Sequence, residues 1–330
     1  MLAVKTTFPH PVTHLAFSPD GAGFAVAQPH SGITIFDRVT GRPTAVIAAP
    51  RVGGYTSLVF CENGTRLAAG STRGTHLYDA VTGTLLGERG GWALARAVLA
   101  ERDGLLLAAN PNGLREVRPE SVGGALASSP LPQSSIAVAV ALSPCGTWAF
   151  GVRGHTRPVL LDLGTRKVAA EVDHPHRGTG YTGPAVCFAA DGGRFAVCDG
   201  DDVRVYAAGD AESDAESESV QRPSLLQRAV GTAVAPRPRL LLKPIFALRR
   251  PDGVGEREKW RPPVAFTPDG RGLLVRRPKN RVQLWDVATG CHAGEWSWRT
   301  DTITALAVAP DGLTAAAGAR FGRVVLWDLE

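Results

Sequence analysis

A turn motif that recurs at a nearly constant interval is the feature that most limits how this chain can fold. Its clearest copies have Pro-Asp-Gly after a Ser, Thr or Ala, and its glycine occurs at Gly21, Gly64, Gly104, Gly146, Gly192, Gly270 and Gly312. The gaps between successive glycines are 43, 40, 42, 46, 78 and 42 residues. A fixed period of this length indicates supersecondary units that bury their apolar faces against one another, so we expect an array of packed repeats.

A second mark keeps register with the first. It is an apolar residue followed in most repeats by Asp, and the pair ends 14 to 16 residues after each glycine. The pairs are Phe36-Asp37, Tyr78-Asp79, Val117-Arg118, Leu161-Asp162, Val205-Tyr206, Trp285-Asp286 and Trp327-Asp328. Two independent marks at a constant spacing show that the repeat is genuine.

The segments between the marks have the pattern of β-strands. In the first repeat, apolar and small residues fill 13–17 and 24–27, and 33–36 alternates with a period of two. Pro presets the backbone at an early turn position, Asp bonds locally, and Gly accepts a positive φ. Each repeat is therefore predicted to be a small antiparallel sheet.

These features together resemble the WD40 repeat family, whose units of about 40–45 residues form four strands and carry a Trp-Asp dipeptide. The resemblance covers essentially the whole chain and implies an all-β fold: a seven-bladed WD40-type β-propeller with four antiparallel strands per blade. Only Trp285-Asp286 and Trp327-Asp328 are true Trp-Asp pairs, and no repeat opens with the family's Gly-His pair. We expect the family's hydrogen-bonded side-chain network to be incomplete here.

The two chain ends predict how the ring closes. The chain stops at Glu330, just after the last Trp-Asp pair, without the fourth strand that earlier repeats place at 44–47 and 84–86. An extra apolar segment, 2–5, precedes the first repeat. We expect this N-terminal strand to pair in the last blade and leave only short, protected edges.

The 78-residue gap interrupts a chain that otherwise forms one domain over 1–330. We interpret 207–260 as a charged insertion between blades five and six, because its one turn motif lies too close to the next repeat for a degenerate eighth blade. Acids alternate with Ala and Ser across 210–219, so this part is predicted to be disordered. The apolar run 240–246 is predicted to supply the fourth strand of blade five.

Three roles for the insertion stay open. The first is a solvated loop whose acidic part screens its basic part, and the second is a tether for another protein. The third is a contact with nucleic acid through the basic stretch 222–261, which has ten Lys or Arg against three acids. Nucleic acid is disfavoured as a partner, because only Phe246 and Trp260 are there to stack on bases.

Apolar run lengths, the N-terminal residues and the cysteines indicate the cellular compartment that we expect. The longest clean apolar run, 136–142, is far below the roughly 20 residues of a membrane span, and the first residues do not resemble a secretory signal, so we expect a cytoplasmic protein. Five cysteines at irregular spacing are expected to be reduced, with a Cys187–Cys198 bridge as the alternative. The 31 Arg against 5 Lys fit a GC-rich genome better than a phosphate-binding surface.

Catalytic and metal-binding motifs are not recognisable, so we predict no catalytic residues, no cofactor and no metal. The acidic cluster 199–202 fits turn chemistry better than a calcium site. His155, His174 and His176 fit polar loops better than a metal site, and the Gly-rich run 177–183 fits a connection better than a phosphate cradle.

Surface recognition is what remains. In the family that the sequence resembles, the loops between second and third strands and the segments between blades line one face and bind peptides or proteins. The register places on that face His30, Tyr55, Arg73, Asn112, His155, Tyr181, Arg277, Asp301, Arg320 and Phe321. Arg and aromatic residues are enriched at interaction hot spots, so these positions predict a protein or peptide partner of acidic character.

The function predicted from the sequence is therefore a non-enzymatic, monomeric interaction platform without membrane contact. The alternative is a propeller enzyme or small-ligand binder with its site at the central channel. A third hypothesis is a detached module whose relatives are fused to kinase or NTPase domains.

Overall fold

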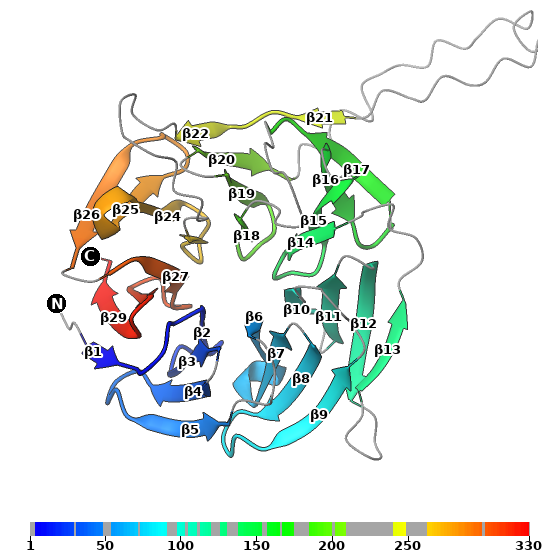
Figure 1. Cartoon of the computed structure of the whole chain (residues 1–330). Coiled ribbons are helices and arrows are strands. Elements are labelled where there is room, and N and C mark those ends of the chain that lie inside the picture. The colour runs from blue at the N-terminus through cyan, green and yellow to red at the C-terminus, as the bar shows by residue number, and fades with distance from the viewer. Residues whose placement is uncertain are drawn as a thin grey trace, which may run out of the picture.

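The computed structural model shows a ring of β-sheets around a central axis (Figure 1). Apart from two short 3-10 helices, η1 (Glu62–Gly64) and η3 (Pro278–Asn280), the regular elements of the described chain are strands. The structure describes residues 4–29, 31–48, 54–71, 73–90, 98–102, 105–110, 113–119, 126–130, 138–153, 157–165, 167–174, 185–199, 202–208, 240–248, 263–298 and 301–329.

The strands pair mostly with their neighbours in sequence, so that each sheet corresponds to one repeat. The first sheets contain β2 (His14–Phe17), β3 (Gly23–Gln28), β4 (Gly32–Asp37) and β5 (Pro43–Ile47); β6 (Tyr55–Cys61), β7 (Arg66–Ser71), β8 (Gly74–Asp79) and β9 (Leu85–Gly90); and β10 (Val98–Arg102), β11 (Leu105–Asn110), β12 (Gly113–Pro119) and β13 (Leu126–Pro130).

The remaining sheets include the two that depart from sequence order. They contain β14 (Val138–Leu142), β15 (Trp148–Arg153), β16 (Arg157–Asp162), β17 (Lys167–Val172) and β21 (Leu240–Leu242); β18 (Ala185–Phe188), β19 (Arg194–Asp199), β20 (Asp202–Ala207) and β22 (Phe246–Leu248); β23 (Val264–Phe266), β24 (Gly272–Arg277), β25 (Arg281–Asp286) and β26 (His292–Ser297); and β27 (Ile303–Val308), β28 (Thr314–Ala319) and β29 (Arg323–Asp328) with β1 (Val4–Thr7).

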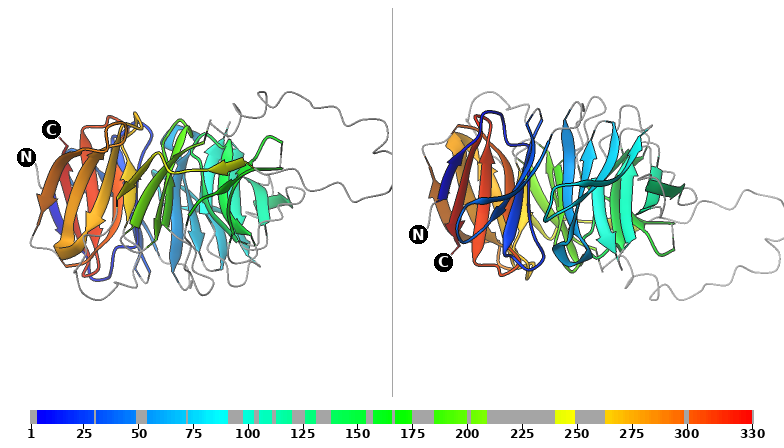
Figure 2. Two further views of the ribbon diagram at one scale, coloured as in Figure 1. Left: turned by 90° about the horizontal axis from the view of Figure 1, so that it is seen from above. Right: turned by 90° about the horizontal axis from the view of Figure 1, so that it is seen from below.

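The sheets are arranged as the blades of a propeller. The first strand of each repeat lies innermost and contacts the first strands of the two adjacent repeats, from β2 round to β27 and back to β2. Seen from the side, the blades stand next to one another in a flat disc (Figure 2). The predicted all-β propeller is confirmed.

The prediction of seven uniform blades, each with four antiparallel strands, is wrong. Only six of the sheets in the described chain have that form. The sheet that begins with β14 has a fifth strand, β21, which pairs in parallel with β17. The repeat count could not reveal this, because the extra strand comes from a segment that carries neither of the two sequence marks.

The turn motifs adopt the conformation that their residues favour. All six of the motif glycines that lie in the described chain have positive φ, between 66° and 89°. In the first motif the Ser18 Oγ accepts a hydrogen bond from the Gly23 amide at 2.9 Å, and the Asp20 carboxylate accepts one from the Ala22 amide at 3.0 Å. The side chains thereby satisfy backbone donors that the tight turn leaves without a backbone partner.

The apolar core lies between the blades. One cluster joins the β2–β5 blade to the β6–β9 blade, and another joins the β23–β26 blade to the closing blade, which consists of β27–β29 and β1. Trp327 of the last Trp-Asp pair is fully buried, and its ring centroid lies 4.6 Å from that of Trp298. Each blade thus buries its faces against its neighbours, as the repeat period requires.

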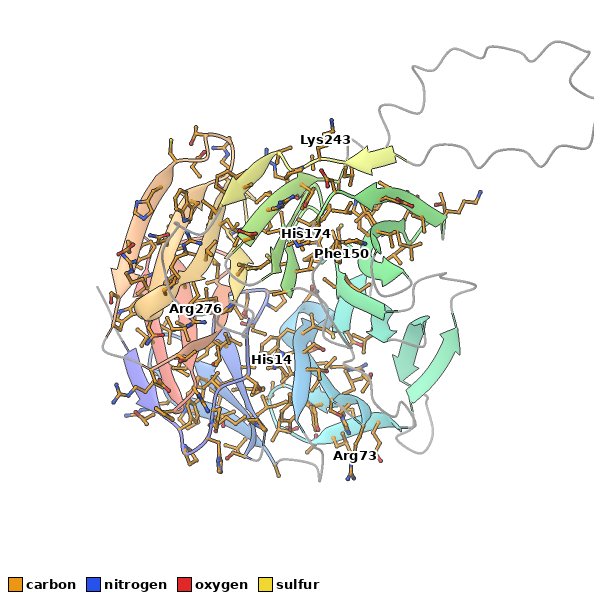
Figure 3. All side chains as sticks on the ribbon, turned by 45° about the horizontal axis from the view of Figure 1, so that its top comes forward. His14, Arg73, Phe150, His174, Lys243 and Arg276 are labelled. Carbon is orange, nitrogen blue, oxygen red and sulfur yellow. The ribbon has the colours of Figure 1, made fainter. Side chains whose placement is uncertain are left out.

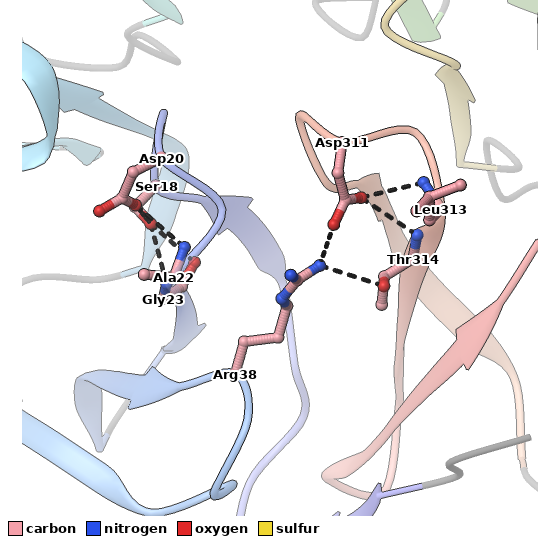
Figure 4. A network of polar contacts seen from close by, with 8 residues as sticks. All are labelled: Ser18, Asp20, Ala22, Gly23, Arg38, Asp311, Leu313 and Thr314. Carbon is pink, nitrogen blue, oxygen red and sulfur yellow. Dashed lines mark hydrogen bonds and ion pairs between the residues drawn. The ribbon is translucent and has the colours of Figure 1, made fainter.

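The ring closes through the N-terminal strand, as predicted. β1 pairs antiparallel with β29, with Val4 opposite Leu326. On the end of the ring that carries the turn motifs, the Arg38 guanidinium forms an ion pair with Asp311 and donates to Thr314 Oγ1 at 3.1 Å (Figure 4). Arg38 follows β4 and Asp311 precedes β28, so this contact joins the first repeat to the last.

The prediction for residues 240–246 is wrong in its detail. Leu240–Leu242 does not complete the β18–β20 sheet but adds β21 to the preceding blade, and Phe246–Leu248 takes the fourth place beside β20. Leu242 is buried in the core between these two blades, and Leu248 is buried in the next core along the ring. We call residues 240–248 the strap, because they cross the outer edges of both blades (Figure 1).

Most of the rest of the predicted insertion lies outside the described residues, although Ala207 still belongs to β20. The residues outside are 209–239, which include the acidic run predicted to be disordered, and 249–260. Both described strands of the segment join neighbouring sheets, and the interpretation of 207–260 as an insertion stays a prediction.

Candidate protein-interaction face

The two ends of the ring carry different connections. The turns between first and second strands and those between third and fourth strands lie at one end, which we call the turn face. The loops between second and third strands and the segments between blades lie at the other, which we call the loop face. This division follows from the antiparallel order of the strands in each blade.

The turn face is rich in carboxylates that are used within their own turns. The Asp37 carboxylate accepts hydrogen bonds from the Thr40 amide and hydroxyl, both at 2.7 Å, and these bonds lower the pKa of Asp37. Local hydrogen bonds act in the same direction at other turns. The pKa is lowered at Asp20, Asp79, Asp269, Asp286 and Asp311.

The loop face carries several of the predicted partner-binding residues, and the structure brings three of them together. Phe321 donates its backbone N–H to the carboxylate of Asp301, and the Arg320 amide donates to the Thr302 carbonyl at 2.8 Å. Phe321 is 71% exposed, and Arg320 is exposed beside it. Here the loop between β28 and β29 is fastened to the segment that enters the closing blade.

Two further arginines lie on the loop face, one in the adjacent blade and one in the same blade. Arg277 ends β24 in the adjacent blade and is half-buried, and its neighbour Arg276 is buried with its amide donating to the Pro263 carbonyl at 3.2 Å. Arg323 begins β29 and is exposed. Arg323 was not among the predicted residues, although the run Arg-Phe-Gly-Arg that it ends points to it.

Arg73 belongs to the same face but not to the same place. It is exposed on the β7–β8 turn, where its amide donates to Ser71 Oγ at 3.1 Å. Figure 3 shows Arg73 and Arg276 in different parts of the ring. The predicted arginines therefore do not form one continuous patch.

Tyr55 is not a surface residue. It begins β6, is 4% exposed and packs in the core between the first two blades. Burial raises the pKa of its phenol to about 12, and no described residue hydrogen-bonds to its hydroxyl. Its place is beneath the loop face, where it contributes packing.

Four of the predicted positions lie outside the described residues. They are His30, Asn112, His155 and Tyr181. Their assignment to the loop face stays a prediction.

Of the histidines considered as metal ligands, His155 and His176 lie outside the described residues. His174 is buried, and its Nδ1 lies 3.3 Å from the hydroxyl of Tyr206, so this histidine packs between blades. In the described residues no three His, Cys, Asp or Glu side chains are grouped as metal ligands would be. His14 of β2 lies near the centre of the ring (Figure 3) and is half-buried.

All five cysteines are free thiols, so the alternative bridge between Cys187 and Cys198 does not form. Within the part of the chain that the structure describes, no helix combines the length and apolar character needed to cross a membrane.

Fold and face together define a β-propeller, the fold that the WD40 resemblance implied. No protein-family model matches the chain, and no curated protein matches it. The crystal structure of the β-propeller domain of Cps50 (Swd1) from Myceliophteria thermophila is similar, with a TM-score of 0.71 and 15% sequence identity over 99% of each chain. In all, 1772 solved chains match, and at 15% identity the likeness shows the fold alone.

Proposed function

We propose that the chain is a non-enzymatic interaction platform whose loop face binds a peptide or protein partner. The observation that carries this proposal is the β28–β29 loop, where Phe321 is exposed yet held by hydrogen bonds to the neighbouring inter-blade segment. A loop whose backbone is already ordered loses little conformational freedom on binding. Exposed aromatic and Arg side chains are the types that carry most of the energy at interfaces.

The proposed surface consists of Arg73, Arg277, Asp301, Arg320 and Phe321, together with the predicted positions outside the described residues. The protein acts as a monomer in the cytoplasm in this proposal, which the free thiols support because a reducing compartment keeps cysteines unpaired.

Cross-linking of the tagged, full-length chain in its own cells, followed by mass spectrometry, tests the proposal. Partner cross-links are expected at residues of the loop face such as Lys279, which lies in η3. The lysines Lys167 and Lys243, at the start of β17 and in the strap, serve as internal controls for other surfaces.

Two outcomes would contradict the proposal. One is a stoichiometric partner whose cross-links all fall on the control lysines. The other is a chain that is alone under every condition and turns over or retains a small molecule, which would support the central-channel alternative.

A further inference from the structure

The β28–β29 loop and its surroundings form one chemically distinct part of the loop face. Phe321 stands between exposed Arg320 and exposed Arg323, with Arg277 at the end of the neighbouring blade's second strand. We call these four residues the arginine–phenylalanine patch. Phe321 is the one aromatic residue among the exposed large apolar side chains of the described chain.

Backbone contacts fix the shape of this patch from two sides. The Gly322 amide donates to the Ala319 carbonyl at 3.1 Å and closes the turn, and the Gly322 carbonyl accepts from the Phe8 amide at 2.8 Å. On the other side, Arg320 and Phe321 bond to the segment before β27. The turn therefore holds the backbone of Phe321 in place, without the ordering cost of a free loop.

Charge indicates what covers the patch. The patch and the neighbouring Arg276 supply four arginines, and the Asp301 carboxylate beside the β28–β29 loop already accepts the Phe321 amide. The opposite face of the ring carries the carboxylate-rich turns. An acidic ligand is therefore attracted more to the patch than to the turn face, where carboxylates accompany arginines such as Arg38 and Arg42.

The arginines can bind such a ligand even when they also make contacts within the protein. Each guanidinium has five N–H donors in a planar fork, so it can keep an intramolecular bond and still bind a carboxylate. Nucleic acid fits less well, since grooves for single strands supply several aromatic side chains and this patch has one.

We propose, building on the proposed function, that the arginine–phenylalanine patch binds an extended acidic peptide segment of a protein partner. Carboxylates of the segment pair with Arg277 and Arg320, and an apolar side chain between them packs on Phe321. The four residues act as one site in this arrangement, so loss of the Phe321 phenyl group or of an arginine charge weakens binding.

Fluorescence anisotropy with the full-length chain tests this inference. The probe is a fluorescein-labelled heptapeptide of Asp and Glu with a central Leu, and the comparison probes replace either the acids by Asn and Gln or the Leu by Ser. We expect the acidic probe to bind, and Phe321→Ser and Arg320→Glu each to weaken it by about tenfold or more. Arg42→Glu, which makes the same charge change at an exposed position of the turn face, is expected to leave the affinity unchanged.

Several results would overturn the inference. These are equal weakening by Arg42→Glu, equal affinity for the amide probe, or binding of an oligothymidine at this patch in place of the peptide. Binding that appears only after the acids of 210–218 are changed to amides would show that the chain itself occupies the patch. A partner cross-linked to other loops of the loop face, with no effect of Phe321→Ser, would leave the platform intact and remove only this assignment.

Discussion

The substitution Gly322→Ala tests how closely the N-terminal segment approaches the closing blade. Gly322 has a φ of +81°, and a Cβ there would lie 2.8 Å from the His10 carbonyl oxygen and closer still to that of Phe8. Gly312→Ala is the matched control, because its φ is +73° but the nearest atom to its Cβ is a proline carbon at 3.7 Å. Both changes strain the backbone, and only the first displaces another segment.

The magnitudes separate the two variants. A non-glycine residue at such a φ costs about 1–2 kcal/mol, which is the whole cost expected for Gly312→Ala. Gly322→Ala must also move the segment that bonds through Phe8 N–H to Gly322 and through Val12 N–H to Ala319, at 2.8 and 3.1 Å. Each hydrogen bond contributes about 1 kcal/mol, so the total for Gly322→Ala is about 3–4 kcal/mol.

Thermal and urea unfolding of the two variants and the wild type provide the assay. With an unfolding entropy of about 2.1 cal/mol/K per residue, the expected loss in Tm is about 4–6 °C for Gly322→Ala and about 2 °C for Gly312→Ala. The urea midpoints should fall in the same order. Equal losses would refute the reasoning, because they would show that the N-terminal segment does not need the space above Gly322.

Three further predictions concern the strap, one turn and acid stability. Phe246→Ala should lower the free energy of unfolding in urea by about 2–3 kcal/mol, because the phenyl group packs on Trp285 and over Gly290. Ile245→Ala, at a side chain 49% exposed, should change it by no more than about 0.5 kcal/mol. Similar losses in the two variants would be inconsistent with an anchoring role of Phe246. Cys145 occupies the position in its turn motif at which Asp20, in the first motif, accepts a backbone N–H. Cys145→Asp should therefore raise the free energy of unfolding by about 0.5–1 kcal/mol in the same assay. No gain would show that this turn does not need the carboxylate. Turn hydrogen bonds hold the pKa of carboxylates such as Asp20 below 3.8, so the contribution of these carboxylates to the free energy of unfolding is complete above the unfolded pKa and is lost as pH falls through the lower folded pKa. Urea unfolding at pH 3 and pH 6 should show this loss of stability, and Asp20→Asn should make the loss smaller. An unchanged pH dependence in Asp20→Asn would contradict the assignment.

The repeat was predictable because the same physical requirement recurs in every blade. A tight turn that needs a positive φ selects glycine, and Gly21 and its counterparts stand at the same place in each described repeat. The closing strand was predictable for a related reason, since the last blade lacks a strand and the N-terminus has one to spare. Local chemistry and strand counting therefore establish most of the ring.

The strap was not predictable at this level. Leu240–Leu242 is apolar enough for an edge strand on either blade, and the choice depends on where a long connection returns to the ring. No local pattern encodes that choice. The sequence therefore indicated a strand but assigned it to the wrong partner.

The candidate site was only partly predictable for a different reason. The repeat register indicates which residues lie near the loop face, but not which of them are covered by neighbours. Phe321 and Tyr55 were equally eligible from the register, yet one is 71% exposed and the other 4% exposed. The difference arises because Phe321 occupies a turn that projects from the blade, whereas Tyr55 begins an innermost strand.

The strap has a consequence for how the ring loses its structure. In arrays of repeats, stability is approximately a sum of each repeat's own terms and those of its nearest neighbours, so one unit can open while distant units stay closed. Here β21 and β22 are joined by three residues but belong to different blades, so separating β22 from β20 pulls on the edge of the β14–β17 blade as well. These two blades should exchange their protected amide hydrogens together, as one cooperative unit within the ring.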